Sequence, residues 1–344
     1  MRRFLLALFS MFIVFTPIAS SQDIEERVEE HILENGFKVL LMERHFSPTV
    51  AAYIVFRAGS VDEEEDSRGI AHMLEHMLFK GTKTVGTRDY ESEKIILKEI
   101  ENLVSATDEE RSRGVEADKE KLKELERRLE EKQEEHKELI VRGEYEAIYT
   151  RNGAVGFNAG TSNDYTIYTI NLPSNRLELW AFLESDRLKN YVLREFYTER
   201  EAVAEERRMR VDTDPQGKLY EKFMATAFQV HPYGEPIIGY EEDIASLTVE
   251  EAEEYFRINY APNNSAIVIV GDIDPGRTLE LLRAYFGDIP SQPQPEHNYP
   301  EEPPQNLELI RHKKVSVTPH IGASTKEAQK RIGQEIVSII KEDI

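Results

Sequence analysis

The segment His72-Met73-Leu74-Glu75-His76 places two imidazoles and one carboxylate within five residues. On an α-helix, residues four apart lie on the same face, so His72 and His76 can bind one metal ion together. Glu75 lies three residues after His72, from where its carboxylate can reach a water molecule on that ion without binding the ion itself. This His-x-x-Glu-His order is the inverse of a known zinc motif. We therefore predict a Zn²⁺ site with Glu75 as the general base.

The same five residues can also occur by chance on an ordinary helix, so the flanking sequence matters. Apolar residues surround the motif on both sides, and Gly69 and Gly81 bound the segment. Polar side chains inside a largely buried helix cost stability unless they are bonded, which favours a metal site. We expect a helix from Arg68 to about Phe79, capped by Ser67.

A third metal ligand must be His, Asp or Glu, because the chain contains no cysteine. The charged segment 195–211 is strongly helical and offers several carboxylates. They are Glu199, Glu201, Glu205 and Glu206. Spacing alone does not choose among them, and we expect most of the four to lie in solvent.

The composition excludes several classes of partner. The chain has 344 residues, enough for about two domains, and its 43 Lys+Arg against 65 Asp+Glu give a net charge of −22. Such acidity argues against nucleic acid and against an anionic membrane surface as the main partner. The absence of cysteine excludes disulfides and thiolate metal sites.

Residues 1–21 resemble a cleaved signal peptide. Arg2 and Arg3 precede an apolar run over 4–19, and small residues follow at Ala19-Ser20-Ser21. The alternative is a short membrane anchor, but the run is shorter than the roughly 20 residues that span a bilayer. We expect a periplasmic or secreted protein with no membrane span in the mature chain.

Segments with strand and helix periodicity alternate along the rest of the chain. Asn35-Gly36 predicts the turn of a β-hairpin over 28–43. Further strands are expected at 50–58, 158–172 and 266–270, and helices at 175–190, 195–211, 218–228, 249–258 and 275–286. Six prolines between 290 and 305 indicate a linker. We predict an α+β fold in which helices pack on an antiparallel sheet.

Residues 91–146 differ from the rest, because 31 of these 56 residues are charged. Leu122, Leu125 and Leu129 keep a spacing of three or four, as do Ile96 and Ile100. This spacing favours two antiparallel helices in a coiled-coil-like hairpin over the alternative, a disordered charged segment. We expect the hairpin to be a solvent-exposed insertion outside the metal site.

Three motifs occur in an order that resembles the pitrilysin/insulinase family of zinc peptidases, which includes the mitochondrial processing peptidases. Residues 69–82 (GIAHMLEHMLFKGT) are similar to the metal helix of that family. Residues 158–161 (NAGT) resemble its edge strand, which implies that Asn158 and Ala159 bind the substrate backbone. Residues 199–206 (EREAVAEE) resemble its downstream helix, which implies that Glu206 is the third ligand and that Glu199 supports the site from behind the ligands.

The resemblance covers roughly residues 28–313 and implies one half of such a peptidase. That half would occupy 22–312, with the hairpin as an insertion and a second segment at about 195–312. The implied activity is zinc-dependent endopeptidase cleavage of a peptide or small protein. Family enzymes normally have a second, similar half, so we expect one as a partner, or a homo-oligomer. The alternative is a non-catalytic peptide-binding or assembly subunit.

Residues 313–344 form a tail that resembles a different family. Val317–Gln329 is similar to the C-terminal catalytic segment of phosphoglycerate-dehydrogenase-type enzymes, where the residue matching His320 is an acid/base. No Gly-x-Gly-x-x-Gly motif follows a strand here, so the sequence predicts no dinucleotide site. We interpret the tail as a fused fragment in which His320 has no substrate.

Overall fold

A computed structural model describes residues 27–293 and 299–300. The chain divides into two compact units, Met1–Tyr299 and Pro300–Ile344, and the architecture below is that of the first. The predicted signal peptide at 1–21 and the dehydrogenase-like tail at 313–344 lie outside the described residues. Within the described ranges, every helix is too short or too polar to cross a bilayer.

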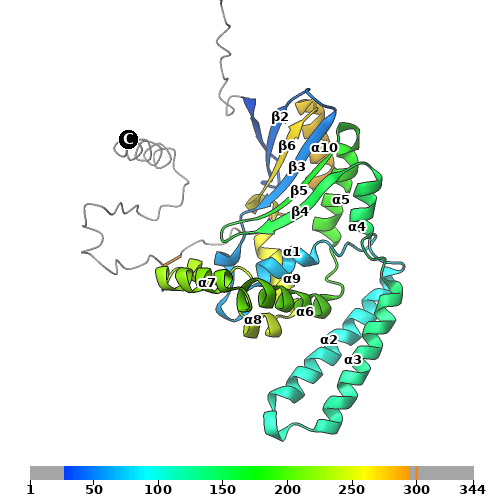
Figure 1. Cartoon of the computed structure of the whole chain (residues 1–344). Helices are drawn as coiled ribbons and strands as arrows, with labels where there is room; N and C mark the ends of the chain where they lie inside the picture. The colour runs from blue at the N-terminus through cyan, green and yellow to red at the C-terminus, as the bar shows by residue number, and fades with distance from the viewer. Residues whose placement is uncertain (1–26, 294–298, 301–344) are drawn as a thin grey trace, which may run out of the picture. The chain divides into compact units, whose positions relative to one another are not determined.

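A six-stranded sheet forms the centre of the first unit (Figure 1). In chain order the strands are β1 (Glu29–Ile32), β2 (Lys38–Glu43), β3 (Thr49–Phe56), β4 (Val155–Thr161), β5 (Thr166–Pro173) and β6 (Ser265–Gly271). Their order in space is β1-β2-β6-β3-β5-β4. Strands β1 and β2 form the hairpin predicted from Asn35-Gly36. The α+β class is confirmed, with one correction: β2 pairs with β6 in parallel, while the other four pairs are antiparallel.

The core lies between the sheet and helices that pack on it. Strand β3 alternates buried and half-buried residues, as a strand with one face on a core does. In Figure 1, helices α4 (Glu144–Arg151), α5 (Leu177–Asn190) and α10 (Pro275–Phe286) lie behind the sheet. Trp180 of α5 is fully buried, and its ring lies 5.9 Å from that of Phe286 on α10. Helices α1 (Ile70–Met77) and α9 (Val249–Asn259) pack against each other near one end of the strands.

The predicted helical hairpin is present as α2 (Tyr90–Ser112) and α3 (Lys119–Leu139), which project away from the sheet (Figure 1). Asp89 and Asp118 cap the two helices. Most hairpin charges are exposed, but two buried groups at its base correct the expectation of a wholly exposed insertion. These are Glu93 on α2 and His136 on α3. Their contacts tie the hairpin to the rest of the fold.

Two further predictions need correction. The single strand expected at 158–172 is two strands, because residues 162–165 form a tight turn in which the N–H of Ser162 donates to the carbonyl of Tyr165. Ser, Asn and Asp favour such turns. The helix expected at 195–211 is α6 (Phe196–Arg207), and a π-helix, Arg208–Asp212, continues it.

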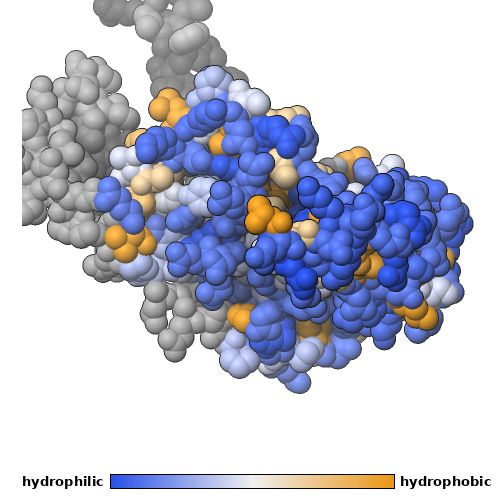
Figure 2. Space-filling model, turned by 90° about the horizontal axis from the view of Figure 1, so that it is seen from below, coloured by the Kyte–Doolittle hydropathy of each residue, from blue (hydrophilic) through white to orange (hydrophobic). Residues whose placement is uncertain are grey.

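Helices α7 (Pro215–Ala227) and α8 (Glu241–Ser246) complete this part of the molecule. Seen from below, this face of the protein is hydrophilic over most of its area, and its apolar side chains lie in separate spots (Figure 2). The distribution agrees with the acidic composition.

Candidate metal centre

Helix α1 carries the His-x-x-Glu-His motif, and it begins differently from the prediction. Gly69, not Ser67, is the N-cap, with φ +96°. A Cβ at Gly69 would lie 2.5 Å from the carbonyl oxygen of Ile238, so the position suits glycine alone. The side chain of Glu63 satisfies the helix start, because its carboxylate accepts the N–H groups of Gly69 (2.9 Å) and Ala71 (3.0 Å). Burial raises the pKa of Glu63 to about 8.

The imidazoles of His72 and His76 lie on one face of α1, with ring centroids 4.7 Å apart. His72 is buried, and its Nδ1 has no hydrogen-bond partner among the described residues. Burial, with the nearby charges of His76 and Arg210, lowers the pKa of His72 to about 3. A neutral imidazole is the form that binds a metal ion.

Glu206, at the end of α6, supplies the third ligand atom. Its Oε1 lies 3.8 Å from Nε2 of His72, and its Oε2 lies 3.4 Å from Nε2 of His76. The three side chains offer ligand atoms that all lie within 4.8 Å of one another. Donors on a tetrahedral zinc with bonds of about 2.0–2.1 Å stand about 3.3–3.5 Å apart, so this set fits zinc with small adjustments.

The structure separates the four carboxylates that spacing left open. Glu201 and Glu205 are exposed, and Glu205 pairs with Arg208. Glu199 lies behind His76 instead of beside Glu206. Nδ1 of His76 donates to Oε1 of Glu199 at 3.0 Å, which leaves Nε2 of His76 directed at Glu206. Such a carboxylate fixes the orientation of a metal-binding histidine.

Electrostatics reinforce this contact. Hydrogen bonds from His76 and from Lys80, whose Nζ lies 2.5 Å from Oε2, lower the pKa of Glu199 to about 2. Burial opposes the charged form of His76, but its hydrogen bond to Glu199 and the charge of that carboxylate raise the pKa of His76.

Glu75 does not join the group of ligand atoms. Its Oε2 accepts the hydroxyl of Thr161, on β4, at 2.7 Å. Burial raises the pKa of Glu75. Glu75 thus faces the same cleft as the two histidines while remaining held by the strand.

Strand β4 forms one edge of the sheet, and its Asn158 and Ala159 border the metal centre. Asn158 pairs with Thr169 and Ala159 with Tyr168, both on β5, and no described strand pairs with the other edge of β4. A cleft of about 490 Å³ joins this edge to the ligands. It is lined by predicted site residues His72, Glu75, His76, Asn158, Ala159 and Glu206.

Three residues of the site were missed by sequence reasoning. Thr161 holds Glu75, Lys80 holds Glu199, and Arg210 lies 2.7 Å from Oε1 of Glu206. Thr161 and Lys80 lie within the family-like segments 158–161 and 69–82. Their place in these segments is the only sequence signal that could have identified them. Arg210 follows Glu206 by one helical turn.

The pattern of the family described as Insulinase (Peptidase family M16) matches residues 38–131 and 143–241, more than half of the chain. The chain belongs to peptidase family M16. A second pattern, described as Peptidase M16 inactive domain, matches residues 246–330. The expectation of a pitrilysin/insulinase-type half is thereby confirmed.

Known relatives of the family are similar over most of this chain. The zinc protease PqqE of Helicobacter pylori is 28% identical over 291 residues, which are 83% of this chain and 52% of that protein. The probable mitochondrial-processing peptidase subunit beta of Schizosaccharomyces pombe is 27% identical over 264 residues, 76% of this chain and 46% of that protein. The chain thus spans about half the length of these relatives.

Solved structures share the fold. The crystal structure of a protease from Helicobacter pylori superposes with a TM-score of 0.60 at 28% identity, over 80% of this chain and 54% of that one. The periplasmic protease PqqL of Escherichia coli has the same fold, with a TM-score of 0.58 at 21% identity, over 80% of this chain and 26% of that one.

Proposed function

We propose that this M16 family member is a zinc-dependent endopeptidase in which His72, His76 and Glu206 bind the metal. One observation carries the proposal: three ligand atoms within 4.8 Å of one another share a cleft with a carboxylate that does not belong to the ligand set. A site that only held a metal for stability would need no such carboxylate. Glu199 supports the centre through His76.

The donor set suits zinc, since two imidazoles and a carboxylate leave a fourth position open in a catalytic site. Zinc bound there supplies Lewis acidity and lowers the pKa of a bound water to about 7. The protein's own part is proton transfer. Thr161 holds the carboxylate of Glu75 by donating to its Oε2, and that carboxylate would accept the proton of the attacking water and pass it to the leaving amine.

The substrate we propose is a peptide or small protein bound as an added strand. The outer edge of β4 offers backbone donors and acceptors beside the metal centre, and an extended peptide can pair with such an edge. Asn158 and Ala159 would then hold the substrate main chain with its scissile bond near Glu75.

We propose that a second M16-type half, or another copy of the chain, covers the cleft. The length of the relatives supports this, as does an exposed aromatic side chain of the cleft. Tyr220 on α7 lines the cleft and is 62% exposed. Peptide hydrolysis needs water to be excluded around the reacting carbonyl. A cleft that is covered on one side only does not exclude it. We also propose that the protein is periplasmic or secreted.

The test is a cleavage assay on residues 22–344, alone and mixed with a candidate second-half protein, using unfolded casein as substrate. We expect about one zinc per chain, weak cleavage alone, and strong cleavage in the mixture that a chelator abolishes. Absence of zinc would overturn the metal site. Zinc without cleavage in any mixture would favour the non-catalytic subunit, and robust turnover by a demonstrated monomer would show that one half suffices.

A further inference from the structure

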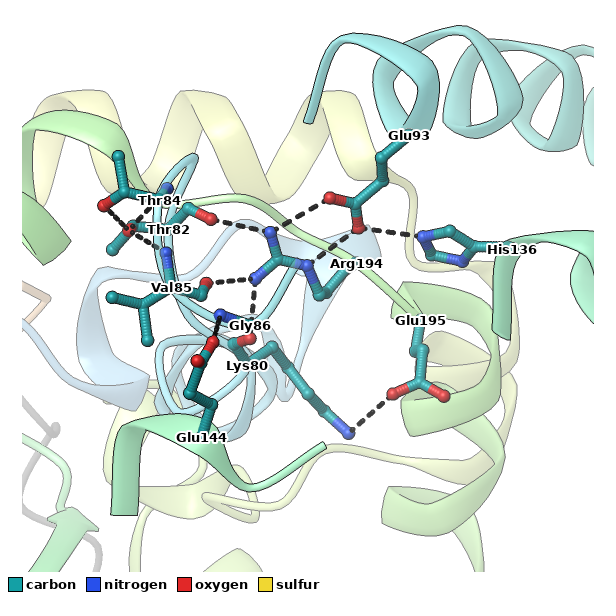
Figure 3. A network of polar contacts seen from close by, with 10 residues as sticks. All are labelled: Lys80, Thr82, Thr84, Val85, Gly86, Glu93, His136, Glu144, Arg194 and Glu195. Carbon is teal, nitrogen blue, oxygen red and sulfur yellow. Dashed lines mark hydrogen bonds and ion pairs between the residues drawn. The ribbon is translucent and has the colours of Figure 1, made fainter. Parts of the chain in front are cut away.

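Arg194 lies between α5 and α6 and is completely buried. Its guanidinium donates to three backbone carbonyls of the loop that follows α1: those of Lys80 (2.7 Å), Thr82 (2.7 Å) and Val85 (3.0 Å) (Figure 3). Its remaining N–H groups donate to the carboxylate of Glu93, at 2.8 and 3.2 Å. All five donors of the guanidinium are therefore used.

The counter-charge for Arg194 comes from the helical hairpin. Glu93 is on α2 and is fully buried, and its Oε1 also contacts Nε2 of His136, on α3, at 2.9 Å. A buried guanidinium that loses its partner is strongly destabilising, so Arg194 depends directly on Glu93 of α2 and, through the contact of Glu93 with His136, indirectly on α3. The hairpin thus completes an ion pair whose other member belongs to the body of the protein.

The loop held by Arg194, residues 80–86, is built around the guanidinium. At Gly86, φ is +88° and a Cβ would lie 2.7 Å from Nη1 of Arg194. The segment that follows α3 also holds this loop, because Glu144 at the start of α4 accepts the N–H of Gly86 at 2.6 Å and the N–H of Val141 donates to the carbonyl of Gly86 at 3.0 Å. The position of the loop is therefore set from two sides.

Lys80 connects this loop to the metal centre. Its carbonyl is bound by Arg194, while its Nζ lies 2.5 Å from Oε2 of Glu199 and 3.9 Å from Oε2 of Glu195. Glu199 in turn accepts from Nδ1 of His76. A continuous series of contacts therefore runs from the hairpin base to a ligand atom.

We propose that Arg194 is a positioning residue for the metal centre and that the hairpin base, through Glu93 and His136, is part of the support of that centre. The hairpin is then more than a tolerated insertion, because removing it would free the loop that carries Lys80. The effect of Arg194 on zinc binding rests on the proposed function. Its effect on the position of residues 80–86 does not.

The matched pair of variants is Glu93→Gln and Glu110→Gln. Both carboxylates are buried on α2, but Glu110 lies at the far end, where it accepts from Nζ of Lys121 (2.7 Å) and the N–H of Asp118 (2.8 Å). On the zinc-free chain, we expect amide hydrogen exchange over residues 80–86 to rise about 10-fold in Glu93→Gln and to stay unchanged in Glu110→Gln. Equal exchange in the two variants would overturn the proposal.

Metal binding provides the second measurement. We expect Glu93→Gln to weaken zinc about 10-fold in a chelator competition, as loss of an outer support does, and to shift the visible spectrum of bound Co²⁺. Glu110→Gln should leave both unchanged. Lys80→Met should weaken zinc without affecting exchange over 80–86, because it breaks the side-chain contacts with Glu199 and Glu195 but leaves the backbone carbonyl that Arg194 binds. His136→Gln, a milder change, replaces Glu93→Gln if that variant fails to fold.

The outcomes separate the two proposals. A wild-type chain that binds no zinc contradicts the proposed function, and the exchange data then still decide whether Arg194 and the hairpin position the loop. A wild-type chain that binds zinc, with Glu93→Gln retaining wild-type affinity and cobalt spectrum, overturns the positioning role while leaving the proposed function intact.

Discussion

The metal cleft and the helical hairpin hold their charged groups in opposite ways. In the cleft, partners come from distant parts of the chain and are largely buried: Glu206 meets His72, and the side chains are 14% and 11% exposed. On the hairpin, most pairs are three or four residues apart and exposed, as Arg127 is with Glu124 and Glu131. Exposed pairs contribute little to stability, whereas buried ones cannot lose a partner cheaply. We therefore expect a substitution that removes a charge to have a large effect on zinc binding or stability where its partner is buried, and a small effect where the pair is exposed.

The largest effect should come from Glu75. In an assembly that cleaves peptides, Glu75→Gln should lower the turnover rate by about 10²–10⁴ and keep its zinc, because an amide cannot accept the proton of water. Steady-state cleavage and elemental analysis of the same preparation measure the two quantities. A variant with near wild-type turnover would show that another group is the base.

Glu206 and Glu205 are adjacent in the chain, but Glu206 points toward the two histidines while Glu205 is exposed. Substituting each in turn compares a buried with an exposed carboxylate. Glu206→Gln removes a charged ligand and should weaken zinc by about 100-fold or more, beyond the usual effect of an outer support. Glu205→Gln changes an exposed partner of Arg208 and should leave zinc bound. Zinc content after dialysis against a weak chelator distinguishes them. Equal retention in both would remove Glu206 from the ligand set.

At the hairpin base the effect should depend on pH. Burial opposes the charge of Glu93, but hydrogen bonds from His136 and Arg194 lower its pKa to about 2. Because this pKa lies below the ordinary value of 4.5, the stabilisation is present above about pH 4.5 and is lost as the pH falls toward 2.

The advantage of the wild type over Glu93→Gln in free energy of unfolding should therefore shrink by about 3 kcal/mol between pH 5 and pH 2. Urea unfolding at several pH values measures it. A gap that stays constant across this range would contradict an ionised, paired Glu93.

The smallest effect is expected on the outer hairpin. Arg127→Gln removes two exposed pairs, with Glu124 and Glu131, and should change the Tm by less than about 1 °C and leave zinc binding unaltered. Differential scanning calorimetry provides the measurement. A Tm shift as large as that of Glu93→Gln would contradict the expected difference between exposed pairs on the outer hairpin and the buried pair at its base.

Local patterns in the sequence predicted much of the fold and three residues of the candidate site, His72, Glu75 and His76, whereas Glu206 and Glu199 came from the resemblance to the pitrilysin/insulinase family. The spacing of His72 and His76 specified a shared helix face, and the leucine spacing predicted α2 and α3. Such inferences succeed because both partners lie within a few residues of each other.

Several of the contacts that escaped prediction join residues beyond one helical turn of each other, although the pair of Arg210 with Glu206 does not. Arg194 contacts Glu93 across 101 positions, and nothing in the residues around Arg194 indicates it. The cap that Glu63 supplies to α1 spans eight positions and replaces the expected role of Ser67. The parallel pairing of β2 with β6 also depends on tertiary structure, because β6 pairs in parallel with β2 and antiparallel with β3, so its own sequence does not specify one direction.

The place of β6 in the sheet has a consequence for how the protein is made. Residues 265–271 lie between β2 and β3, and they pair with both. Every ligand of the proposed metal centre, through Glu206, therefore precedes in the chain the strand that joins β2 to β3. Until β6 takes its place during folding, β2 and β3 keep unpaired edges that other chains can occupy. Insertion of β6 closes both edges at once.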